Sequence, residues 1–166
     1  MKILVFSDTH GRYREMRAAL ARHAPTTDAV FFLGDGCRDL GRIKDDFPTV
    51  AFYSVLGNCD FGITGEGDVY ERFVSLDGFR FLLMHGHRFG VKSGLESAVA
   101  YAKNKGADVL LYGHTHQACD TLDGELYVFN PGSISGDYNG NRTYGILQTV
   151  NGVLVRSHAN LSGLEI

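Results

Sequence analysis

The chain has 166 residues, 44% of them hydrophobic and 21% charged, which suits one ordinary globular domain spanning residues 1–166. Its net charge of −3 argues against a general nucleic-acid or membrane-surface binder, because such proteins carry a basic excess. No run reaches ~18 apolar residues, so no transmembrane helix is expected. The three cysteines have no paired spacing and no signal peptide is evident, so we expect a cytoplasmic protein without disulfides.

The first half of the chain alternates apolar runs with helical patterns. Three apolar runs predict buried strands: 3–6, 29–33 and 50–55. Apolar residues at helical spacing predict an amphipathic helix over 12–22 and a short helix through Leu40 and Ile43. Strands that alternate with helices predict βαβ units and a partly parallel sheet, the pattern of an α/β protein.

The second half is richer in strands and turns. The expected strands are 68–76, 79–84, 108–112, 118–122, 125–130, 143–149 and 152–158. Asp77-Gly78 is a hairpin signal between the first two. One helix is predicted over 94–104, with Ser93 and Glu96 at capping-box spacing.

Two histidines follow the apolar run 108–112. On extended backbone, His114 and His116 would face the same side, ~6.6 Å apart. That separation suits two neighbouring metal ions, which lie about 3.5–4 Å apart in two-metal sites, better than one. A solvated loop that carries two histidines is the alternative interpretation.

Potential metal ligands follow five of the apolar runs: Asp8 and His10, Asp35, Asn58, His85, and His114 with His116. Taken singly, Asp8 could cap a helix, Asp35 could form an Asx turn, and His85 could be a core histidine. Together they predict one site, because open α/β sheets place ligands at the carboxyl ends of their strands. Imidazole combined with carboxylate favours manganese, iron, zinc, cobalt or nickel over calcium.

Five motifs contain these residues: Asp8-Thr9-His10, Gly34-Asp35, Gly57-Asn58, His85-Gly86 and Gly113-His114-Thr115-His116. In order and rough spacing they resemble the motif series of calcineurin-like metallophosphoesterases. Asn130-Pro131-Gly132-Ser133 is similar to a segment of the small single-domain prokaryotic phosphodiesterases. The resemblance runs from residue 3 to about 135 and implies an α/β (α+β) fold, a four-layer αββα sandwich of two mixed β-sheets flanked by helices.

The resemblance also implies a role for each motif residue. Asp8, His10 and His116 would hold one divalent transition-metal ion. Asn58, His85 and His114 would hold a second, and Asp35 would bridge the two. The implied activity is hydrolysis of a small phosphate ester, foremost a diester, by a metal-bridging hydroxide. Manganese is the expected metal, with nickel, iron, zinc and cobalt as alternatives, and an oligomer is possible.

Cys59 departs from the larger family members, which usually have histidine at this position. By resemblance it would contact the substrate phosphate and join Asn58 and Asp35 in the catalytic set. A thiol of pKa ~8.5 can donate a proton but carries no imidazolium charge. Cys59 as a small buried hydrophobe is the alternative, and His87 and Asp60 are other candidate proton donors.

Two other functions stay open. One is a nuclease or nucleotide hydrolase, although the chain lacks the basic stripe with stacking aromatics that long nucleic acid requires. The other is a non-catalytic protein-binding scaffold, for which the retromer subunit of this fold is a precedent. Competent residues at every ligand position argue against the scaffold. Short loops at 61–67 and 86–94 predict an open site.

Overall fold

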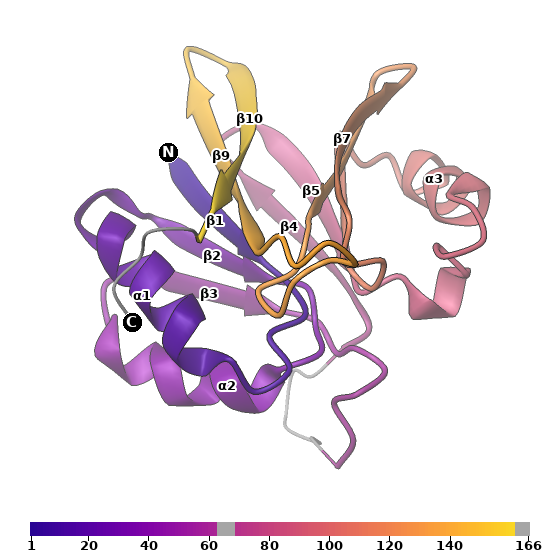
Figure 1. The fold of residues 1–166 in the computed structure, drawn as a ribbon. Coiled ribbons are helices and arrows are strands. Elements are labelled where there is room, and N and C mark those ends of the chain that lie inside the picture. Colours follow the sequence, from indigo (N-terminus) through magenta and orange to yellow (C-terminus); the bar gives the residue numbers. More distant parts are fainter. Residues whose placement is uncertain (63–68, 162–166) are drawn as a thin grey trace.

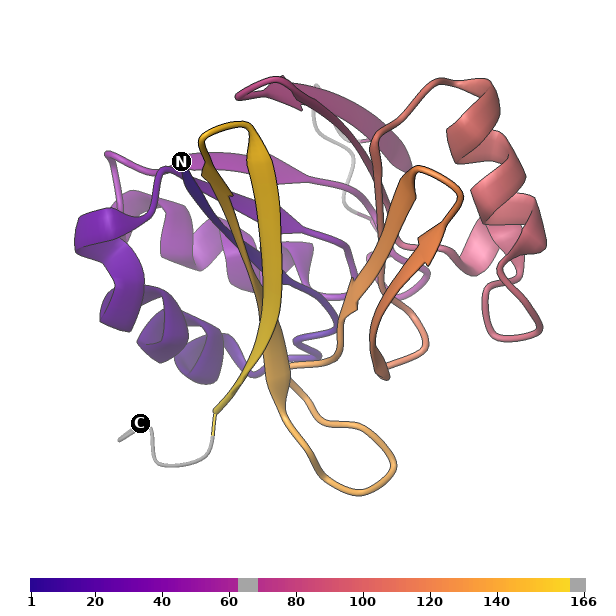
Figure 2. The ribbon, with the colours of Figure 1, turned by 90° about the horizontal axis from the view of Figure 1, so that it is seen from above.

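Two five-stranded mixed sheets form the centre of the computed structural model, which describes residues 1–62 and 69–161 (Figures 1 and 2). One sheet has the strand order β10-β9-β1-β2-β3 and the other β4-β5-β6-β8-β7. The strands are β1 (Lys2–Phe6), β2 (Ala29–Phe32), β3 (Ala51–Ser54), β4 (Glu71–Leu76), β5 (Phe79–Met84), β6 (Val109–Tyr112), β7 (Ala118–Asp123), β8 (Leu126–Pro131), β9 (Thr143–Val150) and β10 (Val153–Asn160). The two mixed sheets agree with the sequence-based expectation.

Helices cover the outer faces of the sheets. The α-helices are α1 (Tyr13–His23), α2 (Cys37–Ile43) and α3 (Glu96–Asn104), and the 3₁₀ turns are Ala24–Thr26, Lys44–Asp46 and His87–Phe89. In β1, Ile3 and Val5 pack between the sheets, whereas Leu4 and Phe6 pack with α1 and α2. On the far side, Leu82 of β5 packs with α3. The layers therefore run helices, sheet, sheet, helix, which confirms the αββα prediction (Figure 1).

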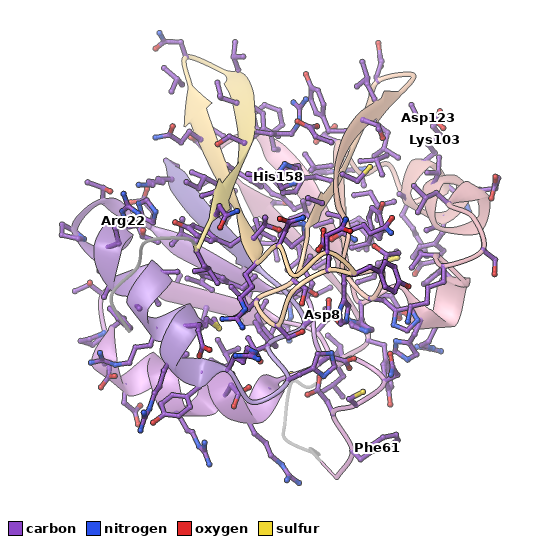
Figure 3. The ribbon with its side chains drawn as sticks, in the orientation of Figure 1. Asp8, Arg22, Phe61, Lys103, Asp123 and His158 are labelled. Atoms are coloured by element: carbon purple, nitrogen blue, oxygen red, sulfur yellow. The ribbon has the colours of Figure 1, made fainter. Side chains whose placement is uncertain are left out.

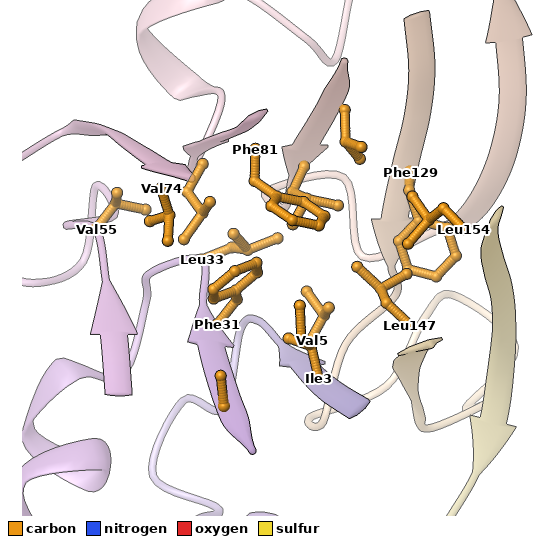
Figure 4. Packing of buried hydrophobic residues seen from close by; sticks show 14 residues of the cluster. Ile3, Val5, Phe31, Leu33, Val55, Val74, Phe81, Phe129, Leu147 and Leu154 are labelled. Atoms are coloured by element: carbon orange, nitrogen blue, oxygen red, sulfur yellow. The ribbon is translucent and has the colours of Figure 1, made fainter. Parts of the chain in front are cut away.

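Successive residues of a strand point to opposite faces of the sheet, and those that point toward the other sheet form the core between the sheets (Figure 4). Phe31 of β2 and Phe81 of β5 meet there edge to face, with ring centroids 5.2 Å apart and an interplanar angle of 65°. Both rings are fully buried. This contact ties one sheet to the other a short distance from the strand ends.

Parallel pairing decides where the loops gather. β2 runs parallel to β1 and β3, and β6 runs parallel to β5 and β8. The carboxyl ends of β1, β2 and β3 therefore lie at one edge of their sheet, and those of β5 and β6 at one edge of the other.

Some boundaries differ from the sequence-based expectation. The capping-box prediction is wrong, because α3 begins at Glu96 after Leu95 with no side-chain cap hydrogen bond. The amide of Ser93 instead donates to the carbonyl of Gly90 (2.8 Å) in a turn that delays the helix. Residues 63–68, which include most of the expected loop 61–67 and the expected start of β4, lie outside the described residues. In the described part of the chain no helix is long and apolar enough to cross a bilayer.

Replacing Phe81 by alanine tests the junction between the sheets. Phe81→Ala should lower the free energy of unfolding by about 3–5 kcal/mol, because it leaves a cavity against Phe31. Urea unfolding followed by circular dichroism measures this. Leu122→Ala is the control, since Leu122 is 59% exposed, and its loss should stay below ~1 kcal/mol. Equal losses in both variants would contradict the packing described.

Candidate metal centre

Seven side chains from five strand-end loops converge where the two sheets meet. They are Asp8 and His10 after β1, Asp35 after β2, Asn58 after β3, His85 after β5, and His114 and His116 after β6. Asp8 lies near the middle of the molecule in Figure 3, while Phe61 extends from its edge. All seven candidates named from the sequence are therefore brought together.

One group consists of Asp8, His10 and His116, whose ligand atoms all lie within 4.8 Å of one another. The Nε2 atoms of His10 and His116 are 3.3 Å apart. Two nitrogens at ~2.1 Å from one tetrahedral ion would be separated by ~3.4 Å. The two imidazoles thus have the spacing of ligands that share an ion.

The second group consists of Asp35, His85 and His114, which satisfy the same 4.8 Å limit. His85 Nε2 lies 3.2 Å from His114 Nδ1 and 3.1 Å from Asn58 Oδ1. The amide oxygen of Asn58 therefore faces the same space as the two imidazoles. The imidazoles of His85 and His114 therefore lie together, and the ligand roles that the family resemblance implied stay a prediction.

Asp35, a member of the second group, also faces the first. Its Oδ2 is 3.8 Å from His10 Nε2 and 3.4 Å from His85 Nε2. Its Oδ1 accepts a hydrogen bond from the amide of Cys59 (2.6 Å), which fixes the carboxylate plane. One carboxylate oxygen therefore faces imidazoles of both groups, as a bridging ligand requires.

Asp8 provides a test of whether a cation fits here. Its Oδ2 accepts from Ser7 Oγ (2.5 Å) and from the amide of His114 (3.0 Å), but its buried Oδ1 finds no hydrogen-bond partner among residues 1–62 and 69–161. His116 Nε2 lies 3.2 Å and His10 Nε2 3.7 Å from that oxygen. Leaving a buried carboxylate oxygen unpaired is costly. A divalent cation among these atoms would satisfy it, so the residues present fit a metal.

Two histidines are oriented for ligation by bonds from their other ring nitrogen. His85 Nδ1 bonds the carbonyl of Leu33 (2.7 Å), and His116 Nδ1 bonds the carbonyl of Gly136 (3.2 Å). A carbonyl can only accept, so each Nδ1 carries a proton, and in the neutral ring each Nε2 presents a lone pair. His85 is thus fully buried and hydrogen-bonded like a core histidine, yet its second nitrogen faces the site.

The electrostatics favour ionised carboxylates. Burial opposes ionisation of Asp8, but the neighbouring imidazoles of His10, His116 and His85 outweigh it and hold the pKa of Asp8 well below its usual range. Burial likewise opposes ionisation of Asp35, and His85 outweighs it, which lowers the pKa of Asp35 to about 2. Burial, with the charge of His85, lowers the pKa of His114 to about 4. Ionised carboxylates and neutral imidazoles are the forms that bind metal ions.

The backbone of the ligand loops is not extended. Asp8, His10, Asp35, His114 and His116 all have positive φ, between 46° and 67°. The expectation that His114 and His116 share one face of extended backbone is therefore wrong, because β6 ends at Tyr112 and left-handed residues follow. The left-handed turns aim His114 and His116 into different ligand groups. Such conformations are uncommon for non-glycine residues and concentrate at functional sites.

Asp60 anchors two of the loops. Its carboxylate accepts hydrogen bonds from the amides of Asp35, Gly36 and Gly57 at 2.8 Å each and of Cys37 at 2.9 Å. Both oxygens are therefore occupied as acceptors, and Asp60 is only 8% exposed. This buried role opposes the hypothesis that Asp60 is a proton donor. Its anchoring role was missed from the sequence, which offered Asp60 only as a candidate proton donor.

Two residues of the Asn130-Pro131-Gly132-Ser133 segment support the remaining loops. Asn130 Nδ2 donates to the carbonyl of Gly113 (3.1 Å) and to Thr115 Oγ1 (3.0 Å). Ser133 Oγ donates to the carbonyl of Asp8 (3.0 Å). Asp8 itself is no helix cap, because α1 begins after Arg12 without a side-chain cap bond. The motif was visible in the sequence, but its supporting role was not.

Cys59 lies at the rim of a pocket of about 400 Å³ that also borders His10, Asp35 and Phe61. Its side chain is exposed, so the alternative of a buried hydrophobe is wrong. Desolvation and the neighbouring carboxylate of Asp35 raise the pKa of Cys59 to about 11, which keeps the thiol protonated near neutral pH. His87 is half-buried beside His85, with ring centroids 5.4 Å apart.

A protein-family model described as the calcineurin-like phosphoesterase superfamily domain matches residues 1–152 of the chain. The chain belongs to this superfamily. Membership implies divalent metal ions, and the two groups of side chains above are the residues of this calcineurin-like phosphoesterase that fit them.

Relatives and solved structures agree. The chain is 35% identical over 137 residues to a probable metallophosphoesterase, YsnB of Bacillus subtilis, covering 81% of this chain and 75% of the relative. It is 33% identical over 171 residues to phosphodiesterase YfcE of Escherichia coli, covering 89% and 87%. In fold it matches a phosphoesterase-like protein of Streptococcus pneumoniae (TM-score 0.82, 24% identity, covering 98% and 94%). It also matches zinc-complexed Vps29 of Entamoeba histolytica (TM-score 0.74, 22% identity, covering 98% and 100%).

Replacing Asp60 by asparagine tests the anchor. Asp60→Asn places an NH₂ group against backbone amides that need acceptors, so the free energy of unfolding should fall by about 2–3 kcal/mol. Asp123→Asn is the control, since Asp123 is half exposed and pairs with Lys103 on the surface, and should cost less than ~1 kcal/mol. Chemical denaturation of both proteins gives the values. A loss no larger than the control would remove the anchoring role.

Proposed function

We propose that the protein is a metal-dependent phosphodiesterase with a two-metal centre. The observation that carries the proposal is the presence of two neighbouring ligand groups, with Asp35 facing imidazoles of both, beside the Oδ1 of Asp8. The family and its relatives with phosphoesterase names support a hydrolase of phosphate esters. Manganese is the first candidate metal, with nickel, iron, zinc and cobalt as alternatives of similar ligand preference.

Each residue has a proposed task. Asp8, His10 and His116 hold one ion, Asn58, His85 and His114 hold the other, and Asp35 contacts both. When bound, the two ions supply Lewis acidity to the phosphoryl group and lower the pKa of water. The chain's own part is to fix these ligands rigidly, through the left-handed loops and the hydrogen bonds that Asp60 accepts from the backbone.

Cys59 is the proposed contact to the substrate phosphate and the leaving group. Its thiol lies beside Asp35 and His10 at the rim of the 400 Å³ pocket. Because its pKa is raised to about 11, the group enters the reaction as a neutral donor. A weak neutral acid serves activated leaving groups better than poor ones.

The scaffold alternative is favoured by one observation, the shared fold with Vps29. At 22% identity that likeness concerns the fold alone. The alternatives separate by metal analysis and an assay with bis(4-nitrophenyl) phosphate. A purified protein without metal and without turnover in added manganese or nickel would favour a scaffold.

Asp35→Asn tests the two-metal assignment. The variant should lose metal at both positions, because an amide replaces the carboxylate that faces both ligand groups. The affinity for manganese should fall by more than about tenfold relative to the native protein. Metal content per chain, measured by plasma mass spectrometry after dialysis against manganese, should therefore be lower than in the native protein. Asp46→Asn, in a surface pair with Arg17, should retain native metal content. Full occupancy in Asp35→Asn would refute the bridging role.

Two substitutions of Cys59 test its chemistry. Cys59→Ala should lower kcat on bis(4-nitrophenyl) phosphate by about tenfold or more, because it removes the proton donor. Cys59→His should recover turnover, since imidazolium is a stronger acid than this thiol. Steady-state kinetics measure both. Rates unchanged in both variants would remove Cys59 from the catalytic set.

A further inference from the structure

A second hollow borders the candidate metal centre and is lined by other residues than the Cys59 pocket. It is a pocket of about 220 Å³ that His114 and His116 help to line. A larger pocket of about 420 Å³ adjoins it and extends away from the ligands. The two pockets share the side chains of Lys92, Thr115 and Tyr138. Together they form what we call the Lys92 channel, which begins at the candidate ligands.

The far part of the channel has apolar side chains in its wall beside the polar Thr115 and Gln117. Val91, Leu95, Tyr112 and Ala118 line it, and of these Val91 and Tyr112 are buried. Tyr138 stands at the junction of the two pockets with 84% of its side chain exposed. Apolar walls with an aromatic face and a volume of several hundred Å³ are typical of small-molecule sites. A flat ring is the group that such a wall and Tyr138 would contact best.

The near part of the channel carries an available positive charge. Lys92 is exposed, and within residues 1–62 and 69–161 no carboxylate lies within salt-bridge distance of it. The nearby carboxylate of Asp137 is occupied by the amides of Asn139 and Asn141 and by the side chain of Asn141. The ammonium group is therefore free to meet an anion at the ligand end of the channel.

We propose that the Lys92 channel binds the retained ester arm of a phosphodiester, and that this arm carries a flat aromatic or heterocyclic ring. The proposal rests on the proposed function and names its substrate class. A diester has two arms, and the centre lies between two hollows: the Cys59 pocket, bordered by His10 and Asp35, and the Lys92 channel, bordered by His114 and His116. The leaving group takes the Cys59 side, Lys92 faces a phosphate oxygen, and Tyr138 covers the ring of the retained arm.

The test compares phenyl 4-nitrophenyl phosphate with methyl 4-nitrophenyl phosphate, which share a leaving group. The difference in intrinsic reactivity between the two esters cancels when the phenyl-to-methyl ratio of kcat/KM in one variant is compared with that ratio in another. Tyr138→Ala should lower the phenyl-to-methyl ratio by about tenfold, whereas Tyr138→Phe, which keeps the ring, should retain it. Lys92→Ala should lower kcat/KM for both esters in parallel, while the surface variant Lys44→Ala should change neither.

Binding separates failure of the channel from failure of the proposed function. Titration calorimetry of the manganese-loaded protein should show tighter binding of phenylphosphonate than of methylphosphonate, and Tyr138→Ala should abolish the preference. If Tyr138→Ala abolishes the preference but the native protein turns over neither ester, the channel is supported and the diesterase function is refuted. Turnover with the same phenyl-to-methyl ratio in Tyr138→Ala and native protein would refute the channel, as would binding of neither phosphonate.

Discussion

The carboxylate of Asp60 holds together the loops on which the centre depends. Four backbone amides from two separate loops donate to its two oxygens. Hydrogen bonds from amides to an ionised carboxylate are among the stronger ones in proteins. Because one of these amides belongs to Asp35 and another precedes Asn58, the bonds fix a ligand of each loop relative to the other. Rigid ligand loops of this kind allow a site to hold a metal without rearrangement.

The close approach of the loops also restricts which residues can occupy them. A Cβ atom at Gly57 would lie 2.1 Å from Asp35 Oδ1, and one at Gly113 would lie 2.0 Å from Ser7 Oγ. Neither position has room for a side chain. Glycine therefore allows the loops after β2 and β3 to touch, and lets the loop after β6 reach Asp8. The positive φ of five ligands is tolerated because these contacts over-determine the backbone.

The charges of the site and its surroundings serve different ends. Buried Asp8 and Asp35 concentrate negative charge at the centre, where imidazoles of both ligand groups converge. Lys92 lies at the opening of a neighbouring hollow, where an anionic substrate would meet it. The net charge of −3 conceals this local arrangement, because it sums groups that lie on different sides of the molecule. Local placement is therefore more informative about the substrate than the total.

The sequence by itself predicted most of the strands and the identity of the candidate ligands, and the resemblance of its motifs implied the layers of the fold. Apolar runs such as that of β1 and the chemistry of residues after each strand are local properties, and parallel strands bring their carboxyl ends to one edge. Only the tertiary structure decided the left-handed backbone at His114 and His116, the anchoring by Asp60 and the exposure of Cys59. These depend on contacts between distant segments: the bond from His114 to Asp8 spans 106 positions. No local pattern encodes such a contact, because its geometry exists only after both sheets have packed.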